Sequence, residues 1–540
     1  LSKRMGLSHG FDVYDDDMGS RSESSQLPGT FPERRAAVTT DRALDWLRQN
    51  GGKRFLLWVH YFDPHSPYDP PQPYKAPYAK DLYSGEIAYM DEQVGRLLDG
   101  IAEKRLDSNT LVAVIGDHGE GLGEHAELTH GIFLYESTLR VPFILAGPEV
   151  PGGKAIDEQV RSIDVMPTLL AFLNLPGDKG IQGISLWPLI QQGRKVASNY
   201  AYVETLYPRT RMGWSELRGM RTGTYKLIQA PHPELYDIKR DPKEKANLIG
   251  RYPAEADRLL KHIWEVAGEE SRQEKVVASP LDTETRQELE SLGYVSAGTP
   301  REIRLGTDAP DPKDRLEILQ SVEQAEGLLA QGEFQRAAQL MDWGLKRDPG
   351  NPLVHIYLAA AYGRMGQLER EIAVYQHALQ MKIETDQIYS RLGKAYMRMK
   401  RLDKAVDALS RATAMNPLDL DAFNNLGAAY YRLGRMGEAE RAFRAVIVQN
   451  ERNGAAYDGL GLVAVRRGDA PSAQKYFEKA LEVDAAQVDP LLNLGMLFQV
   501  TGRKEQAVHY YTKFLEKASK EEYGAMIPGV RQAIQECRRK

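Results

Sequence analysis

The chain has 540 residues, of which 42% are hydrophobic and 27% are charged, so length and composition fit three or four average globular domains. Its net charge of −5 and the lack of any basic run argue against nucleic acid as the main partner. The single cysteine, Cys537, excludes an intrachain disulfide and a thiolate metal cluster, and no apolar run approaches the ~20 residues of a membrane span.

The first residue is Leu1 rather than a methionine, and neither a basic nor an apolar leader segment follows it. We therefore expect the natural N-terminus to lie upstream. The residues present do not indicate a cellular compartment.

Residues 1–297 alternate between strand-like and helix-like segments, which is an α/β pattern. Residues 55–61, Phe-Leu-Leu-Trp-Val-His-Tyr, predict a strand. Residues 84–104 predict a helix whose apolar side chains share one face. Residues 111–115, Leu-Val-Ala-Val-Ile, predict an inner strand of a parallel sheet, and residues 141–145 predict a further strand.

A polar turn, Gly116-Asp117-His118-Gly119-Glu120, directly follows the predicted strand at 111–115. Ligands of open α/β sheets bind just beyond the carboxyl ends of the strands. Asp117 and His118 are therefore candidate metal ligands. The turn alone leaves a second interpretation open, an ordinary end of a strand with solvated polar side chains.

Residues 279–312 are rich in Glu, Thr, Gly and Pro, and they predict a connection with one short helix near residues 283–292. We place the linker itself at residues 298–316. The chain then divides into an α/β portion at 1–297, this linker, and a helical region at 317–540.

The helical region has a fixed period of 34 residues. Glycines preceded by leucine recur at this interval, and alanines hold the matching position of a second helix: Gly393, Gly427, Gly461 and Gly495, with Ala405, Ala439, Ala473 and Ala507. The pattern resembles the tetratricopeptide repeat. It implies an all-α solenoid of about six repeats, starting near residues 318, 352, 386, 420, 454 and 488, with a capping helix to Lys540.

Such arrays bind protein partners or mediate self-association. Asn424, Asn425 and Asn493 fall on the first helices of their repeats, where they are candidates for contact with an extended peptide. A merely solvated helix face is the alternative for these three side chains.

Eight segments of the first half follow one another in a distinctive order: residues 10–16 (Gly-Phe-Asp-Val-Tyr-Asp-Asp), 61–71 (Tyr-Phe-Asp-Pro-His-Ser-Pro-Tyr-Asp-Pro-Pro), 116–125, 135–142, 164–170, 183–186, 221–227 and 234–248. Each motif is weak alone, but together and in this order they resemble the sulfatase family. The resemblance implies an alkaline-phosphatase-like α/β fold, incomplete in this chain, and hydrolysis of sulfate esters of small molecules or glycans.

The resemblance also implies a divalent cation, usually Ca²⁺ with Mg²⁺ or Mn²⁺ as alternatives, held by oxygen-rich ligands. It assigns Asp117 and His118 to this metal, and His65 and His130 to the catalytic donors that contact the sulfate. His130 stands one position away from a lysine of many relatives. The family nucleophile is a formylglycine made from the Cys or Ser of a Cys/Ser-x-Pro/Ala-x-Arg motif.

This nucleophile motif does not occur in the chain: Cys537 lies in the last predicted helix, and no serine begins the motif. The family's Asp-Asp pair after a first strand is also missing, because Asp15 and Asp16 follow a loop. We therefore expect the formylglycine and the acidic pair in a missing N-terminal segment, and we expect this chain to be inactive alone.

Two alternatives stay open. A histidine in the ligand pair also suits a softer ion, and relatives on the same fold cleave phosphodiesters or phosphonates. In the other alternative the repeats form a scaffold and the α/β half is non-catalytic. By resemblance, relatives of this two-part layout are periplasmic, extracellular or membrane-anchored.

Overall fold

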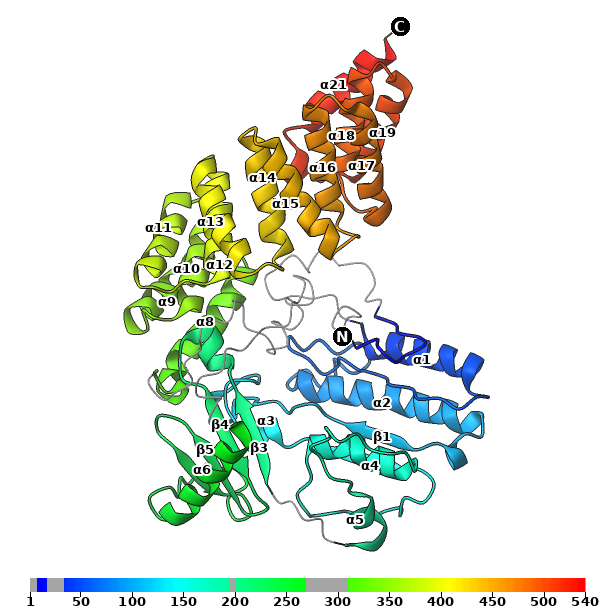
Figure 1. Cartoon of the computed structure of the whole chain (residues 1–540), viewed down its shortest axis with the longest axis vertical. Coiled ribbons are helices and arrows are strands. Elements are labelled where there is room, and N and C mark those ends of the chain that lie inside the picture. The colour runs from blue at the N-terminus through cyan, green and yellow to red at the C-terminus, as the bar shows by residue number, and fades with distance from the viewer. Residues whose placement is uncertain (1–6, 17–33, 195–199, 269–308, 540) are drawn as a thin grey trace. The chain divides into compact units, whose positions relative to one another are not determined.

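A computed structural model describes residues 7–16, 34–194, 200–268 and 309–539. They separate into two compact units, an α/β unit within Val13–Glu274 and Arg304–Leu316 and a unit of helical repeats within Glu317–Lys540 (Figure 1). None of the described helices combines the length and the apolar character that a membrane span requires.

The α/β unit begins with two packed helices, α1 (Ala36–Asn50) and α2 (Leu82–Glu103). Helix α2 confirms the helix predicted at 84–104. It starts where the Asp81 carboxylate accepts a hydrogen bond from the Ser84 backbone N–H, which satisfies a donor that the first helical turn leaves open. The buried Tyr89 fixes the pair, because its hydroxyl accepts a hydrogen bond from the Ala37 N–H at 2.9 Å.

Strands β1 (Val112–Ile115) and β2 (Phe143–Ala146) confirm the strands predicted at 111–115 and 141–145, but the parallel arrangement expected for 111–115 is wrong. They pair antiparallel, with Val112 opposite Ala146 and Ile115 opposite Phe143. A parallel pair needs a long crossover, usually a helix. The chain between β1 and β2 contains only η4 (Glu124–Ala126) and α3 (Glu136–Leu139), and it doubles back to β1.

The strand predicted at residues 55–61 is wrong, because these residues pair with no strand in the described part of the structure. Leu56 and Trp58 are 75% and 56% exposed, so this face of the segment is largely open to solvent. The composition of this segment favours a strand, but a ladder also needs a neighbour that is distant in sequence.

A four-stranded antiparallel sheet follows, in the order β3-β4-β5-β6. Its strands are β3 (Ala201–Thr205), β4 (Leu217–Arg221), β5 (Tyr225–Gln229) and β6 (Glu234–Asp237). Helix α6 (Pro253–Ala267) covers one face through a core of Met220, Leu227, Leu235, Leu259 and Ile263. Short elements complete this unit: η3 (Asp107–Asn109), η5 (Ser162–Asp164), α4 (Val165–Phe172), α5 (Trp187–Gln192) and η6 (Pro208–Met212).

The end of the predicted linker packs against the α/β unit. Ser215 donates to the Ala309 and Pro310 carbonyls, and Asp311, just before η8 (Pro312–Arg315), accepts from the His232 N–H at 3.0 Å. Residues 298–308 of the linker and the helix predicted near 283–292 lie outside the described residues.

The helical unit has the predicted all-α architecture. Six helix pairs follow one another in the described residues: α8 (Leu316–Ala330) and α9 (Phe334–Arg347), α10 (Pro352–Arg364) and α11 (Leu368–Gln380), α12 (Asp386–Arg398) and α13 (Leu402–Met415), α14 (Leu420–Arg432) and α15 (Met436–Gln449), α16 (Gly454–Arg466) and α17 (Ala470–Val483), α18 (Asp489–Val500) and α19 (Lys504–Lys517). Helices α20 (Lys520–Tyr523) and α21 (Ile527–Arg538) follow them.

The recurring glycines let the two helices of a pair approach closely. A Cβ atom on Gly461 would lie 2.3 Å from the ring of Phe477, and one on Gly495 would lie 2.4 Å from the ring of Tyr511. Any larger side chain would displace a buried aromatic ring. The 34-residue period of the glycines therefore corresponds to a contact between the two helices of a pair, and this contact repeats along the array.

Candidate active site

The loop between β1 and β2 carries most of the candidate residues. It leaves β1 at Gly116, whose N–H donates to the Pro142 carbonyl at 3.1 Å and so keeps the two strands together. A Cβ atom on Gly119 would lie 2.1 Å from the Ser137 carbonyl oxygen, so only glycine fits there. The polar turn is thus pressed against the chain that returns to β2.

A small backbone hairpin shapes the next part of this loop. Gly121 and Gly123 donate their N–H groups to the carbonyls of Thr129 and Glu127, at 2.7 and 2.8 Å. The buried Glu127 carboxylate then accepts the Ile132 N–H at 2.7 Å. Burial raises the pKa of Glu127 to about 7. Glu127 thus binds the backbone two residues after His130 and holds this part of the loop in place.

Asp117 and His118 lie side by side at the end of β1. The Asp117 Oδ1 accepts the His118 backbone N–H at 2.9 Å. The His118 Nδ1 lies 2.8 Å from the Gly119 carbonyl, which can only accept, so this nitrogen carries the proton. Desolvation by the surrounding loops raises the pKa of Asp117, but the His118 charge, its backbone N–H and His60 outweigh this and lower it overall.

These two side chains fit part of a cation site. The His118 Nε2 lies 3.9 Å from the Asp117 Oδ1, a separation at which both atoms can contact one ion. Among the described residues, no group of three or more His, Cys, Asp or Glu side chains is arranged to hold a metal. The residues that the structure describes therefore supply a carboxylate and an imidazole, and they do not supply a complete coordination shell.

His65 reaches the same region from the loop after residues 55–61. The buried Glu86 of α2 holds this loop, because its carboxylate accepts the N–H groups of His65 at 3.1 Å and Asp69 at 2.7 Å. The imidazole stacks on Phe62, with ring centroids 4.2 Å apart. Burial, and then the charge of His130, lower the pKa of His65.

Three of the predicted site residues converge. The His118 and His130 rings have centroids 3.9 Å apart, and the His65 and His130 centroids are 6.4 Å apart. The buried Glu120 carboxylate lies 3.2 Å from the His130 Nδ1 and accepts the Tyr68 hydroxyl at 2.9 Å. Residues from two loops thus form one cluster of three imidazoles and a carboxylate at the end of β1.

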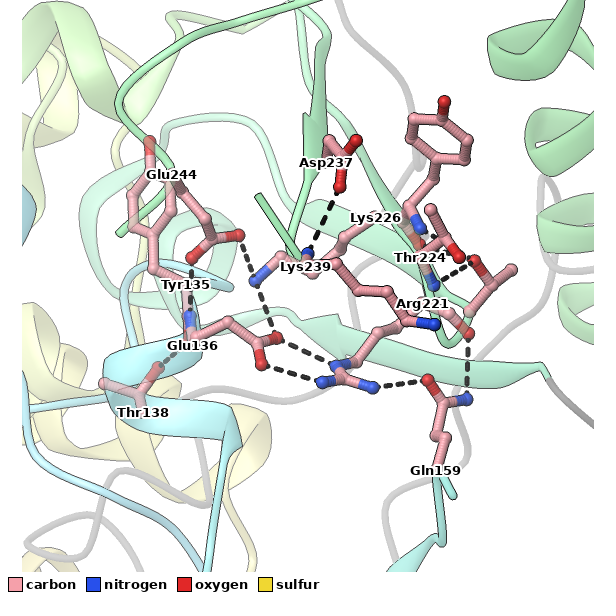
Figure 2. Close-up of polar contacts among 12 residues, drawn as sticks. Tyr135, Glu136, Thr138, Gln159, Arg221, Thr224, Lys226, Asp237, Lys239 and Glu244 are labelled. Carbon is pink, nitrogen blue, oxygen red and sulfur yellow. Dashed lines mark hydrogen bonds and ion pairs between the residues drawn. The ribbon is translucent and has the colours of Figure 1, made fainter. Parts of the chain in front are cut away.

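A buried ionic network fixes the end of the same loop on the four-stranded sheet (Figure 2). Arg221 of β4 donates to both Glu136 oxygens at 2.9 Å, and it also contacts Gln159. Lys226 of β5 lies 3.3 Å from Glu136 and 2.5 Å from Glu244. The Glu244 carboxylate in turn accepts the Glu136 N–H at 2.7 Å. Glu136 is therefore tied to strands far from it in sequence.

Apart from Glu120, a candidate support of the metal turn, the sequence did not single out the partners that hold this cluster. Glu120 follows the candidate metal turn, but its spacing is equally typical of a solvated glutamate. Tyr68 and Glu86 lie in a proline-rich loop and on a helix face, and the networks of Glu136 and Lys226 join separate elements. The sequence feature that could have indicated these partners is that several Asp and Glu residues stand close to the histidines in both loops.

In the repeats, the three candidate asparagines contact their own array. Asn493 donates to the Asp458 carboxylate at 2.8 Å, across α18 and α16. Asn424 donates to Asn453 at 3.3 Å, and Asn425 donates to the Asp421 carbonyl at 2.7 Å. Their contact with a peptide stays a prediction.

Comparisons with known proteins place both units. The sulfatase family matches residues 3–175, and the C-terminal domain of N-sulphoglucosamine sulphohydrolase matches residues 123–269. Residues 313–537 match the C-terminal domain of cilia and flagella-associated protein 70, a tetratricopeptide-type region.

Curated relatives match the first unit. An arylsulfatase of Clostridium perfringens is 28% identical over 281 residues, covering 43% of this chain and 57% of the relative. A Δ4,5-hexuronate-2-O-sulfatase of Bacteroides thetaiotaomicron is 32% identical over 168 residues, covering 29% of this chain and 34% of the relative. A multifunctional alkaline phosphatase superfamily protein of Trinickia caryophylli is 25% identical over 302 residues, covering 43% of this chain and 58% of the relative.

The chain thus spans between about a third and three fifths of the length of these relatives. The ordered motifs of the first half, the loop that they build at the end of β1 and these matches agree with one another. The first half of the chain is a sulfatase-family domain, and a tetratricopeptide-like helical repeat region follows it.

Proposed function

We propose that the natural protein hydrolyses sulfate esters of small molecules or glycans at the cluster at the end of β1. The observation that carries this proposal is the convergence of His65, His118 and His130, from two loops, in a domain matched by the sulfatase family. Imidazoles at such a place can donate to the oxygens of an anion whose negative charge grows in the transition state.

In this proposal His65 and His130 donate to the sulfate, and Asp117 and His118 are two of the ligands of one divalent cation. Ca²⁺ is the first choice because the family uses hard oxygen ligands, and Mg²⁺ is an alternative for the same reason. The imidazole makes the softer Mn²⁺ a second alternative. When bound, such an ion neutralises charge on the oxygens of the ester. In this proposal the other ligands of the cation are the acidic pair and the formylglycine, which residues 1–540 do not supply.

The nucleophile is proposed to be a formylglycine that residues 1–540 do not encode, because no Cys or Ser in them begins a Cys/Ser-x-Pro/Ala-x-Arg motif. Residues 1–540 alone are therefore expected to be inactive. We place the sulfatase-domain portion at 1–297, the linker at 298–316 and the repeats at 317–540. The repeats are proposed to bind a protein partner or to mediate self-association, and a periplasmic, extracellular or membrane-anchored location would suit this layout.

Hydrolysis of phosphodiesters or phosphonates is a second candidate, and His118 is the observation that favours it. A nitrogen ligand next to Asp117 binds a transition metal ion more favourably than it binds Ca²⁺. Both candidates use the same cluster, so only the relative rates on the two ester classes separate them.

The test uses the natural gene product, with 4-nitrophenyl sulfate and bis(4-nitrophenyl) phosphate as substrates. Asp117→Ala is expected to abolish hydrolysis and to weaken Mn²⁺ binding measured by calorimetry. Asp107→Ala, which alters an exposed aspartate of η3, is the matched control and should leave both unchanged. Full activity in Asp117→Ala would contradict the metal assignment. A nucleophile position occupied by an inert residue would instead favour a scaffold.

A further inference from the structure

We propose that Glu120 and Tyr68 position His130, with its Nδ1–H held toward Glu120 and its Nε2 as the atom that exchanges a proton or a hydrogen bond with the substrate. This inference rests on the proposed function for the identity of the substrate, a sulfate or phosphate ester. The arrangement of Tyr68, Glu120 and His130 itself does not depend on it.

The carboxylate of Glu120 stands between two donors. Its Oε1 lies 3.2 Å from the His130 Nδ1, and its Oε2 accepts the Tyr68 hydroxyl at 2.9 Å. The Glu120 side chain is 6% exposed and that of His130 is 16% exposed. A buried carboxylate keeps its charge only when donors satisfy both oxygens, and here each oxygen has one.

The direction of each hydrogen bond follows from the chemistry of the groups. Burial raises the pKa of Tyr68, and the Glu120 charge raises it further, so the hydroxyl stays protonated and donates. The Glu120 Oε2 accepts this hydroxyl, and its Oε1 lies 3.2 Å from the His130 Nδ1, where a carboxylate oxygen can only accept. The His130 Nδ1 must therefore carry the proton.

A histidine whose Nδ1 is bound in this way has its tautomer and its ring orientation fixed. The same arrangement of a carboxylate behind an imidazole orients the catalytic histidine of many hydrolases. In this chain the His130 ring also rests on His118, with centroids 3.9 Å apart, which restricts its rotation from a second side. Glu120 is thus a positioning residue that acts through His130.

Tyr68 links this triad to the loop that carries His65. Its ring contacts Tyr83 of α2 edge-on, with centroids 5.3 Å apart, so the hydroxyl that meets Glu120 is anchored on a helix. The two loops that bring His65 and His130 together are therefore joined through one carboxylate. Loss of Glu120 should therefore let the distance between His65 and His130 vary more, and it should also release the His130 ring from its Nδ1–H tautomer.

The test is ¹⁵N NMR of the imidazole nitrogens in the full chain, with His130 assigned by comparison with His130→Gln. In the wild type we expect a protonated Nδ1 at His130. In Glu120→Gln the amide oxygen should take the Tyr68 hydroxyl, so that the amide NH₂ faces His130 and the proton moves to Nε2. Tyr68→Phe leaves the carboxylate in place and should keep the proton on Nδ1.

A wild-type His130 protonated only at Nε2, or a tautomer that Glu120→Gln does not change, would overturn the inference. Circular dichroism of each variant checks that the fold is retained. Inorganic sulfate, added to the same samples, probes the proposed function separately: it should shift the Nε2 resonance of His130. If sulfate shifts no imidazole while the tautomer responds to Glu120→Gln, the proposed function fails and the positioning role stands.

Discussion

The buried lysine of Figure 2 allows a quantitative test of the α/β unit. The Lys226 side chain is 0% exposed, and its ammonium group contacts Glu136, which is 11% exposed, and Glu244, which is 1% exposed. Lys226→Met removes the positive charge and keeps most of the side-chain volume. Glu136 retains both hydrogen bonds from Arg221, so the loss falls mainly on Glu244.

Removing one partner of a buried ion pair costs about 3–5 kcal/mol, because the remaining charge stays desolvated and unpaired. We therefore expect Lys226→Met to lower the free energy of unfolding by about that amount. Adding Glu244→Gln removes the unpaired charge and keeps an acceptor for the Glu136 N–H. The double variant should regain on the order of 1–3 kcal/mol relative to Lys226→Met.

Equilibrium urea unfolding followed by tryptophan fluorescence measures this effect in the full chain. Five of the six tryptophans lie in the α/β unit: Trp46, Trp58, Trp187, Trp214 and Trp264. Lys239→Met changes an exposed lysine of the same region and should alter stability by less than about 0.5 kcal/mol. A loss from Lys226→Met no larger than this control, or a double variant less stable than Lys226→Met, would refute the reasoning.

Two further predictions concern the repeats, and far-UV circular dichroism during urea unfolding measures both. Burial raises the pKa of Asp458 to about 7, so ionisation of the unfolded chain makes the wild type lose stability as pH rises from about 4 to 7. Asp458→Asn removes this loss, and its advantage should grow from near zero at pH 4 to roughly 2–4 kcal/mol above pH 7; an advantage independent of pH would contradict the assignment. Gly461→Ala should lower the free energy of unfolding by about 1–3 kcal/mol because its Cβ would meet the Phe477 ring at 2.3 Å. Gly437→Ala on α15, whose Cβ would make an ordinary contact with the Arg441 guanidinium at 3.9 Å, should be neutral or stabilising. Equal effects of the two substitutions would argue against close helix packing at Gly461.

The sequence by itself determined the architecture of the repeats. Each repeat is a local unit, and its helices are close in sequence, so spacing alone reports their contacts. The glycines at a period of 34 residues lie where α12, α14, α16 and α18 meet their partner helices. The order of motifs in the first half likewise indicated the sulfatase family before any geometry was known.

Tertiary structure decided how the strands pair and what surrounds the histidines. The segments at 111–115 and 141–145 predicted strands correctly, but their antiparallel pairing depends on a loop that doubles back. Residues 55–61 have the composition of a strand and lack a partner, because a ladder depends on residues elsewhere in the chain.

The same limit applies to the candidate site. His65, His118 and His130 could be named from motifs, whereas the hydrogen bonds of Glu120 join residues 52 and 10 positions away. Residue spacing encodes contacts within a helix, a turn or one repeat. It does not encode contacts between distant loops, which form only when the core that positions those loops has folded.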